Sequence, residues 1–314
     1  MQFIITEQDR DVTVLAFLRR ELSPSTKMLK YLKYREDGIL VDGKHRTVRY
    51  RLQPGERLEV ATEDKERNDA LLPVELPLDV LYEDEDLVVP AKPADMPTHP
   101  SRDHYGDTVA NALAFRYRHL GGAFVFRPIN RLDRNTSGLL LIARNKLSAG
   151  KLTRALQGGE IQKTYLAILE GELAEESGRI DRCLHRTAQS IILREVCSPD
   201  APDADPSLTE YRVLCRGNGY SLVMAHPITG RTHQLRVHFA SIGHPILGDD
   251  LYGQESPVIP RHALHAYTLS FPHPTTHERL TLRAPLPSDM EQALLQLLPQ
   301  GIDAIRAQED KELL

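Results

Sequence analysis

Apolar residues gather in runs short enough to be single strands, and two of these runs alternate clearly with polar residues. TYLAILEG, LTEYRVLC and YSLVMAHP are followed by LHAYTLSFPHP and RLTLRAP. Alternation with a period of two places every second side chain on the same face of a sheet. Many such strands follow one another with few helices between them. The pattern therefore predicts an α+β fold on a mixed, largely antiparallel sheet, and it disfavours a doubly wound sheet.

The region after residue 77 also predicts several other elements. LDVLYEDEDLVVPAK reads as two short strands around an acidic turn, and LLLIA, residues 139–143, as a buried strand. Asn145 can cap a helix that follows this strand. A second helix is expected to start after a turn at Gly230 and to end at Gly243, and the last 25 residues predict a broken amphipathic helix.

The first sixty residues predict a small domain of their own. SPSTKMLKYLKY has a capping serine and apolar residues at helical spacing with lysines between them, and GILVDGKHRTVRYRLQPGERLEV predicts short strands joined by turns. Between Arg19 and Arg51 there are ten basic residues against four acids. A solvated helix face explains this charge equally well when it is taken alone. The segment resembles the ribosomal-protein-type αL RNA-binding module, which implies RNA contacts from Lys27, Lys30 and Lys33.

A charged stretch with little periodicity, ATEDKERNDALLPVELP, follows this domain and ends in two prolines. We therefore predict an αL-type domain over residues 1–62, a linker over 63–76 and a second, larger domain over 77–314.

Composition excludes several classes of protein. A hydrophobic content of 41% with 26% charged residues is ordinary for a globular protein, and no apolar run approaches the length of a membrane span. The start, MQFIITEQDRD, lacks the basic end and apolar core of a signal peptide, so we expect a cytoplasmic protein without a membrane partner. The net charge of -5 argues against coating of nucleic acid without regard to sequence. The three cysteines have no CxxC spacing and no HExxH occurs, so no metal site is expected.

One segment places an acid between two guanidinium groups. In RPINRLDRNTSGLLLIARN, Asp133 stands between Arg131 and Arg134. Opposite charges nearby stabilise the ionised form of a carboxyl group, and an ionised carboxylate can act as a nucleophile. Taken alone, however, NTSG can equally be a turn before a strand, capped by Asp133.

Two further segments carry polar residues that a core would not select. Tyr165 stands near the start of a predicted strand, where a tyrosine is usually a packing residue with its hydroxyl in water. HPITGRTHQLRVHFASIGHPILGDDLYG is the densest polar segment. Its predicted helix places Arg236 beside an apolar stripe, where the guanidinium can reach the edge of a cleft while the stem packs. Arg231, His233 and Gln234 crowd the same turn.

Together these segments resemble the RluA-type family of RNA pseudouridine synthases, in order from Leu78 to Pro287. The signatures are RLDRNTSG, KTYLAILEG, TEYRVL and TGRTHQLRVHFASIGHPILGDDLYG. The resemblance implies that Asp133 is the nucleophile, that Tyr165 lies against the target base, and that Arg236 pairs with the aspartate. It also implies RNA contacts, with Arg131 filling the space of the flipped base and with further contacts from Thr136, Arg231, His233 and Gln234.

The family reaction detaches uracil from ribose at nitrogen 1 and rejoins it through carbon 5. This isomerisation requires no cofactor and no metal. The resemblance implies an RNA partner, with large-subunit ribosomal RNA favoured and transfer RNA left open, and we expect a monomer. Asn130 and Asn135 stand where histidine and aspartate are frequent in the family, which affects only the expected local contacts to RNA.

Two other functions compete with this prediction. A retaining glycosidase also uses an aspartate at an anomeric carbon, but it needs a second carboxylic acid at about 5 Å, and the motifs supply no obvious one. An RNA-binding assembly factor built on an inactive synthase body would have lost Asp133 or Arg236, and both are present.

Overall fold

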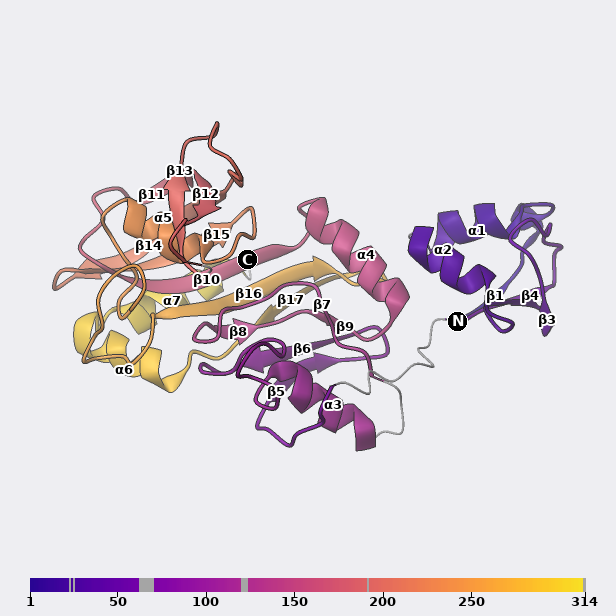
Figure 1. Ribbon diagram of the computed structural model, residues 1–314, viewed down its shortest axis with the longest axis horizontal. Helices are drawn as coiled ribbons and strands as arrows, with labels where there is room; N and C mark the ends of the chain where they lie inside the picture. The colour runs from indigo at the N-terminus through magenta and orange to yellow at the C-terminus, as the bar shows by residue number, and fades with distance from the viewer. Residues whose placement is uncertain (23, 25, 62–70, 120–123, 191, 313–314) are drawn as a thin grey trace.

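The computed structural model describes residues 1–22, 24, 26–61, 71–119, 124–190 and 192–312 (Figure 1). Its strands form a four-stranded sheet, an eleven-stranded sheet and a two-stranded ribbon, and the pairing within them is almost entirely antiparallel. The exception is the parallel pair β8 and β16. The predicted α+β fold on a mixed, largely antiparallel sheet is confirmed.

The four-stranded sheet belongs to the first sixty residues and has the order β1-β4-β2-β3. Its elements are β1 (Gln2–Ile4), a 3-10 turn (Glu7–Asp9), α1 (Val14–Glu21), α2 (Thr26–Lys33), β2 (Ile39–Val41), β3 (Lys44–His45) and β4 (Arg57–Val60). Phe17, Leu18, Leu32 and Leu58 are among the buried side chains of its core. The predicted lysine-rich helix is present as α2, whereas its predicted capping serine lies outside the described residues. So does most of the predicted linker, because residues 62–70 are not described.

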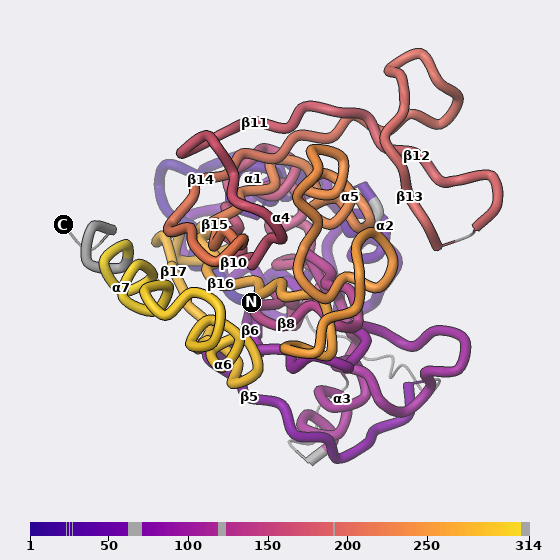
Figure 2. Tube along the Cα trace, turned by 90° about the vertical axis from the view of Figure 1, so that its left-hand side faces the viewer, coloured from indigo at the N-terminus to yellow at the C-terminus, as the bar shows by residue number. Residues whose placement is uncertain are grey.

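The large sheet has the order β11-β14-β15-β10-β16-β8-β6-β9-β7, with β17 beside β16 and β5 beside β6. Its strands are β5 (Asp79–Glu83), β6 (Leu87–Lys92), β7 (Arg127–Pro128), β8 (Ser137–Leu139), β9 (Ile142–Ala143), β10 (Gln162–Glu170), β11 (Ser177–Asp181), β14 (Leu208–Gly217), β15 (Tyr220–Pro227), β16 (Leu264–Pro272) and β17 (Arg279–Arg283). The ribbon of β12 (Cys183–Arg186) and β13 (Arg194–Cys197) stands out from the body of the molecule (Figure 2).

Helices cover this sheet and its ends (Figure 1). They are α3 (Val109–His119), α4 (Lys146–Gln157), α5 (Gln234–Ser241), α6 (Ser288–Leu297) and α7 (Gly301–Glu312). Leu152 and Ala155 of α4 pack in a core with Leu269 and Phe271 of β16. In the described part of the chain, every helix is too short or too polar to cross a lipid bilayer.

Some predicted elements differ from the observed ones. The predicted strand over 139–143 is divided between β8 and β9, because its partner β6 contains Pro90, which has no N–H to donate to the ladder. Helix α5 begins at Gln234 and not directly after Gly230, although it ends before Gly243 as predicted. Helix α3 was not predicted. Asn145 caps α4 as predicted, since its side chain accepts a hydrogen bond from the Ser148 N–H.

Candidate active site

The three motif segments meet at one pocket of about 660 Å³. It is lined by the loop 128–136, by Lys163 and Tyr165 of β10, and by the segment 227–236 that leads into α5. Leu156 and Gln157, at the end of α4, complete one wall. The chain crosses between these segments along neighbouring strands of the large sheet, so residues more than a hundred positions apart line the same cavity.

Asp133 lies on a tight turn in which the Thr136 N–H donates to the Asp133 carbonyl at 3.1 Å. Three buried side chains hold the backbone around this turn through its carbonyl oxygens. Lys92 Nζ donates to Arg134 at 2.8 Å, Thr98 Oγ1 to Leu132 at 2.9 Å, and Arg261 Nη1 to Asn135 at 3.0 Å. The turn is therefore fixed from behind, which leaves the Asp133 carboxylate directed at the pocket by a rigid backbone.

The expected pair of arginines around Asp133 is not found. Arg134 forms its ion pair with Asp95 at 2.6 Å, and Arg131 is exposed at the pocket. Neighbouring side chains on an extended segment or a turn point in different directions, so adjacency in sequence does not bring charges together. Among the described residues, the cationic or titratable nitrogens within 4 Å of the Asp133 carboxylate belong to Arg236, at 3.7 Å, and His233, at 3.8 Å.

Arg236 is bound most tightly by an acid that the sequence did not identify. Its Nε and Nη2 atoms donate to the two carboxylate oxygens of Asp249 at 2.7 and 2.6 Å. Arg236 is 4% exposed and Asp249 is fully buried. Burial alone would raise the pKa of Asp249, but the hydrogen bonds and charge of Arg236 outweigh it and lower that pKa. Asp249 thus fixes the guanidinium in a bidentate grip, and its remaining nitrogen, Nη1, faces Asp133.

His233 contacts the same carboxylate from a strained position. It precedes α5 with φ 56°, in the left-handed region that is uncommon for residues other than glycine. Its Nδ1 lies 2.8 Å from the Tyr252 hydroxyl, which itself accepts a hydrogen bond from the Arg194 N–H. The Tyr252 hydrogen can therefore be donated to Nδ1, so that the Nε2 hydrogen faces Asp133. Burial lowers the pKa of His233, which favours the neutral imidazole.

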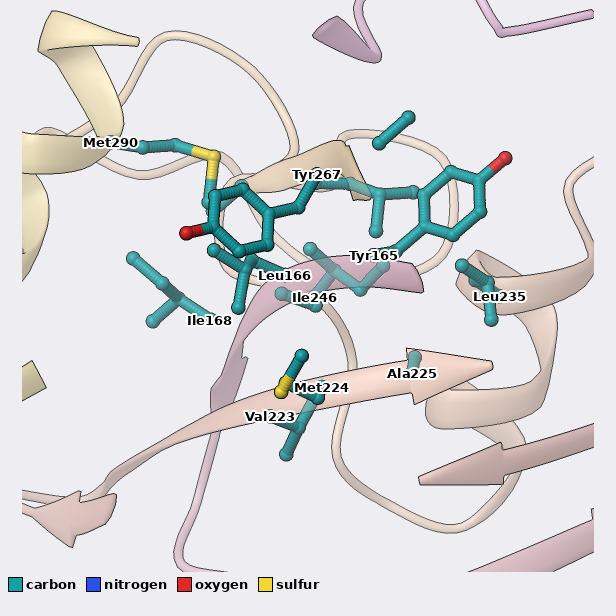
Figure 3. Packing of buried hydrophobic residues seen from close by; sticks show 14 of the residues in the cluster. Tyr165, Leu166, Ile168, Val223, Met224, Ala225, Leu235, Ile246, Tyr267 and Met290 are labelled. Atoms are coloured by element: carbon teal, nitrogen blue, oxygen red, sulfur yellow. The ribbon is translucent and has the colours of Figure 1, made fainter. Parts of the chain in front are cut away.

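Tyr165 comes from β10, opposite the turn. Figure 3 shows its ring beside Leu235, with the hydroxyl pointing away from the apolar cluster. The residue is 8% exposed and lines the pocket. Burial, with a smaller contribution from the negative charge of Asp133, raises the pKa of the phenol. Tyr165 is therefore protonated at rest and offers the pocket a neutral hydroxyl beside an apolar ring.

Known proteins resemble this chain over most of its length. The family described as RNA pseudouridylate synthase matches residues 86–241. An uncharacterized RNA pseudouridine synthase of Bacillus subtilis, YjbO, is 36% identical over 274 residues, which are 87% of this chain and 95% of that protein. The chain belongs to the RNA pseudouridine synthase family. The resemblance to RluA-type enzymes drawn from the motifs is confirmed.

Two further comparisons agree with the family. Ribosomal large subunit pseudouridine synthase D of Nitrosomonas europaea is 34% identical over 83% of this chain and 76% of its own length. The solved structure of human RNA pseudouridylate synthase domain containing 1 aligns with a TM-score of 0.57 and 31% identity, covering 74% of this chain and 95% of that one. The chain is thus an RNA pseudouridine synthase, an isomerase that converts uridine to pseudouridine.

The other predicted contacts of this synthase fall into two groups. Arg231 is exposed at the pocket and forms an ion pair with Asp205 at 3.2 Å. Exposed ion pairs contribute little free energy, so an RNA contact could replace this one. Thr136 is buried and its hydroxyl is bound to His262 at 2.8 Å. Gln234 is 4% exposed and uses its whole amide group within the protein. It donates to the Leu208 carbonyl and Thr209 Oγ1, and it accepts from Thr229 Oγ1 and the Arg231 N–H. This geometry favours a positioning role for Gln234 and Thr136 over direct RNA contact.

The predicted lysines of the amino-terminal domain lie away from this pocket, on helix α2. Lys30 and Lys33 are exposed, and Lys33 Nζ lies 5.9 Å from the centre of the exposed Tyr34 ring. The Lys27 side chain is outside the described residues. The exposed cations of α2 thus lie beside an aromatic ring that follows the helix, a combination typical of nucleic-acid contacts.

The geometry also weakens the glycosidase alternative. The nearest additional acid bound to the site arginine is Asp249, whose oxygens accept hydrogen bonds from Arg236 and from the Leu251 and Tyr252 N–H groups. With its pKa lowered, Asp249 is ionised and has no proton to give to a leaving group. A retaining glycosidase needs a carboxylic acid whose pKa is raised.

Two buried histidines behind the Asp133 turn predict an acid-sensitive fold. Burial lowers the pKa of His262 to about 3 and that of His265 to about 4. Unfolded histidine titrates near pH 6.5, so below that pH the unfolded chain binds more protons and stability falls as the pH decreases toward the folded values. We expect each of them to contribute a loss of about 2 kcal/mol in the free energy of unfolding between about pH 7.5 and about pH 5.

Urea unfolding at the two pH values measures this loss. His262→Gln keeps an acceptor for Thr136. It should reduce the loss in the free energy of unfolding between the two pH values by about 2 kcal/mol, the contribution of one histidine. His277→Asn, at an exposed position, is the control and should leave the dependence as in the wild type. An equal pH dependence in the wild type and His262→Gln would contradict the prediction.

Proposed function

We propose that Asp133 is the nucleophile of this synthase and that the pocket receives a uridine flipped out of structured RNA. The observation that carries the proposal is the convergence of Asp133, Arg236 and Tyr165 on one cavity from three separate segments. Extrusion of a stacked base requires a few kcal/mol, and an exposed cation at the rim, Arg131, suits the space that the base vacates.

The proposed reaction is an isomerisation, so it adds no atom to the substrate and removes none. The Asp133 carboxylate attacks the ribose or the base, and the bond between uracil nitrogen 1 and ribose carbon 1′ breaks. The base turns, carbon 5 bonds to carbon 1′ and the bond to Asp133 breaks, which releases the carboxylate; carbon 5 then loses a proton and nitrogen 1 gains one. Arg236 stabilises the carboxylate and orients it, and His233 offers an N–H from the same side.

We assign removal of the carbon 5 proton to the Tyr165 hydroxyl, acting directly or through water: the phenol oxygen accepts that proton while its own hydrogen passes to water or to uracil nitrogen 1, so the phenol stays neutral. Replacing Tyr165 with Phe keeps the ring that packs beside Leu235 and removes only the hydroxyl. We expect RNA affinity within about threefold of the wild type and turnover reduced by about 10²-fold or more, the usual contribution of a positioned acid or base. Rapid-quench analysis should detect an intermediate in which uracil is already joined to ribose through carbon 5 but still carries the carbon 5 hydrogen. Unchanged turnover in Tyr165→Phe would reject this role.

We further propose that the substrate is large-subunit ribosomal RNA, with transfer RNA as the alternative. Several relatives are named ribosomal large subunit pseudouridine synthase D, which supports this choice. Purified enzyme should be incubated with ribosomal and transfer RNA transcripts separately, and pseudouridine should be mapped by carbodiimide modification and primer extension. New stops confined to transfer RNA would overturn the ribosomal assignment.

The remaining features of the proposal follow from the same substrate. We propose residues 1–62 as an αL-type RNA-binding domain, joined by a linker over 63–76 to a catalytic domain over 77–314, and a cytoplasmic enzyme because its RNA substrates are there. We propose that the enzyme acts as a monomer, because a single chain supplies Asp133, Tyr165 and Arg236 to the pocket.

A further inference from the structure

Helix α4 has a charge that differs from that of the chain around it. Its twelve residues, KLSAGKLTRALQ, include three basic residues and no acid, in a chain that has 44 acids and a net charge of -5. One end of the helix contributes Leu156 and Gln157 to the pocket. Its other end lies beside helix α2 of the amino-terminal domain (Figure 1). The helix therefore connects the two parts of the molecule that we assign to RNA.

The contact between α4 and α2 combines one buried apolar side chain with a cation-π pair. Leu147 is 3% exposed and belongs to the apolar core of the amino-terminal domain. Lys146 Nζ lies 3.7 Å from the centre of the Tyr31 ring, a cation-π distance. On the catalytic side, Asn145 Nδ2 and Ser148 Oγ both donate to Asp86 Oδ1, in the turn between β5 and β6. Helix α4 is thus anchored to both domains at its first turn.

The outer face of α4 runs from this contact to the pocket. Lys146, Gly150, Thr153 and Gln157 recur at helical spacing, and Arg154 flanks them. Thr153, Arg154 and Gln157 are exposed, and Gly150 is partly exposed. Eleven residue steps at about 1.5 Å each give this face a length of about 17 Å. A Cβ at Gly150 would meet only the Arg154 Nη1 atom, at 3.9 Å, so the helix surface is bare at its middle.

We propose that the outer face of α4 is a binding track for the RNA backbone between helix α2 and the pocket. Phosphates are attracted by cations and repelled by carboxylates. The helix has no acid of its own, and its exposed cation is Arg154, because Lys146 Nζ lies over the Tyr31 ring and Lys151 Nζ donates to the Pro274 carbonyl. Among the described residues, no acid forms an ion pair with Arg154, which leaves its guanidinium available to a phosphate. The glycine in mid-helix allows the backbone of a strand to approach closely. The inference rests on the proposed RNA substrate and extends it to a surface outside the pocket.

Two substitutions test the track without endangering the fold. Gly150→Glu places a side chain and a negative charge at the bare position, and glutamate favours a helix more than glycine does. Arg154→Ala removes one exposed cation. Gln296→Glu is the matched control, because it adds the same charge at an exposed position of α6, far from α4 (Figure 1). Thermal midpoints should confirm that all three variants fold like the wild type.

Filter binding to a large-subunit ribosomal RNA transcript measures the effect. We expect Gly150→Glu to raise the Kd by about tenfold and Arg154→Ala to lower the slope of log Kd against log salt concentration by about one. The effect on turnover should fall on KM more than on kcat, while Gln296→Glu behaves like the wild type. If the wild type is active and Gly150→Glu binds the transcript with the same Kd as Gln296→Glu, the proposed binding track is wrong, whereas the proposed function stands. A wild type that binds the transcript but converts no uridine in any RNA would instead contradict the proposed function.

Discussion

Asp133→Asn should abolish turnover and retain RNA binding. The substitution preserves the size of the side chain and the turn that Lys92, Thr98 and Arg261 hold from behind, but an amide is not a nucleophile. Removal of the nucleophile from a covalent enzyme costs about 10⁴-fold to 10⁶-fold in turnover, and we expect a loss in that range. Single-turnover assays with enzyme in excess over RNA measure the rate, and filter binding measures the Kd.

Asp95→Asn is the matched control for this experiment. Asp95 is exposed and pairs with Arg134, the neighbour of Asp133, so the control changes the same charge outside the pocket. Asparagine also tolerates the left-handed backbone that Asp95 adopts, with φ 61°. We expect wild-type turnover in Asp95→Asn. Appreciable turnover in Asp133→Asn, more than about one hundredth of the wild-type rate, would show that another group acts as the nucleophile.

Asp249→Ala should damage both stability and catalysis. The change leaves the Arg236 guanidinium buried with its main counter-ion removed, and breaking a buried pair in this way costs about 3–5 kcal/mol. The arginine should also lose the orientation that directs Nη1 at Asp133, so turnover should fall by at least about 10²-fold even where the variant is folded. Urea unfolding measures the first effect, and turnover at low temperature measures the second.

Asp250→Ala separates these effects from a general loss of charge. Asp250 adjoins Asp249, is 57% exposed in its side chain, and lies 3.5 Å from the same guanidinium. We expect it to lose less than about 1 kcal/mol of stability, as is usual for exposed ion pairs. If Asp249→Ala and Asp250→Ala reduced stability and turnover equally, the two hydrogen bonds from Arg236 to Asp249 would not be what orients the guanidinium.

The sequence predicted the general architecture because apolar runs of strand length mark the long strands of the sheet. Strand β14 alternates between buried and exposed residues over its first half, whereas β10 and β16 are buried along almost their whole length. The sequence also singled out Asp133, Tyr165 and Arg236, because each lies in a long polar motif, and in the structure these three residues line one pocket. The aspartate's surroundings were predicted less well. Arg131 and Arg134 are neighbours of Asp133 only along the chain, whereas its actual partners are Arg236 and His233, about a hundred residues away.

Asp249 shows a different limit of the sequence. The segment GDDLYG was recognised as part of a motif, but two adjacent acids give no sign of which one is buried. The choice depends on how the chain turns after α5, which sends Asp249 toward Arg236 and Asp250 toward solvent. In the same way, the helical pattern of α4 predicted its cap at Asn145, but not that Leu147 would join the core of another domain. Such contacts are set by tertiary packing, which local periodicity does not encode.

The most direct test of the account is tritium release from RNA transcribed with uridine labelled at carbon 5. Loss of the carbon 5 hydrogen occurs in pseudouridine formation and in neither hydrolysis of the glycosidic bond nor RNA binding. Ribosomal and transfer RNA transcripts should be assayed separately with the wild type and Asp133→Asn. The account predicts release by the wild type and none by Asp133→Asn. Release by both proteins at similar rates, or by neither on any RNA, would contradict it.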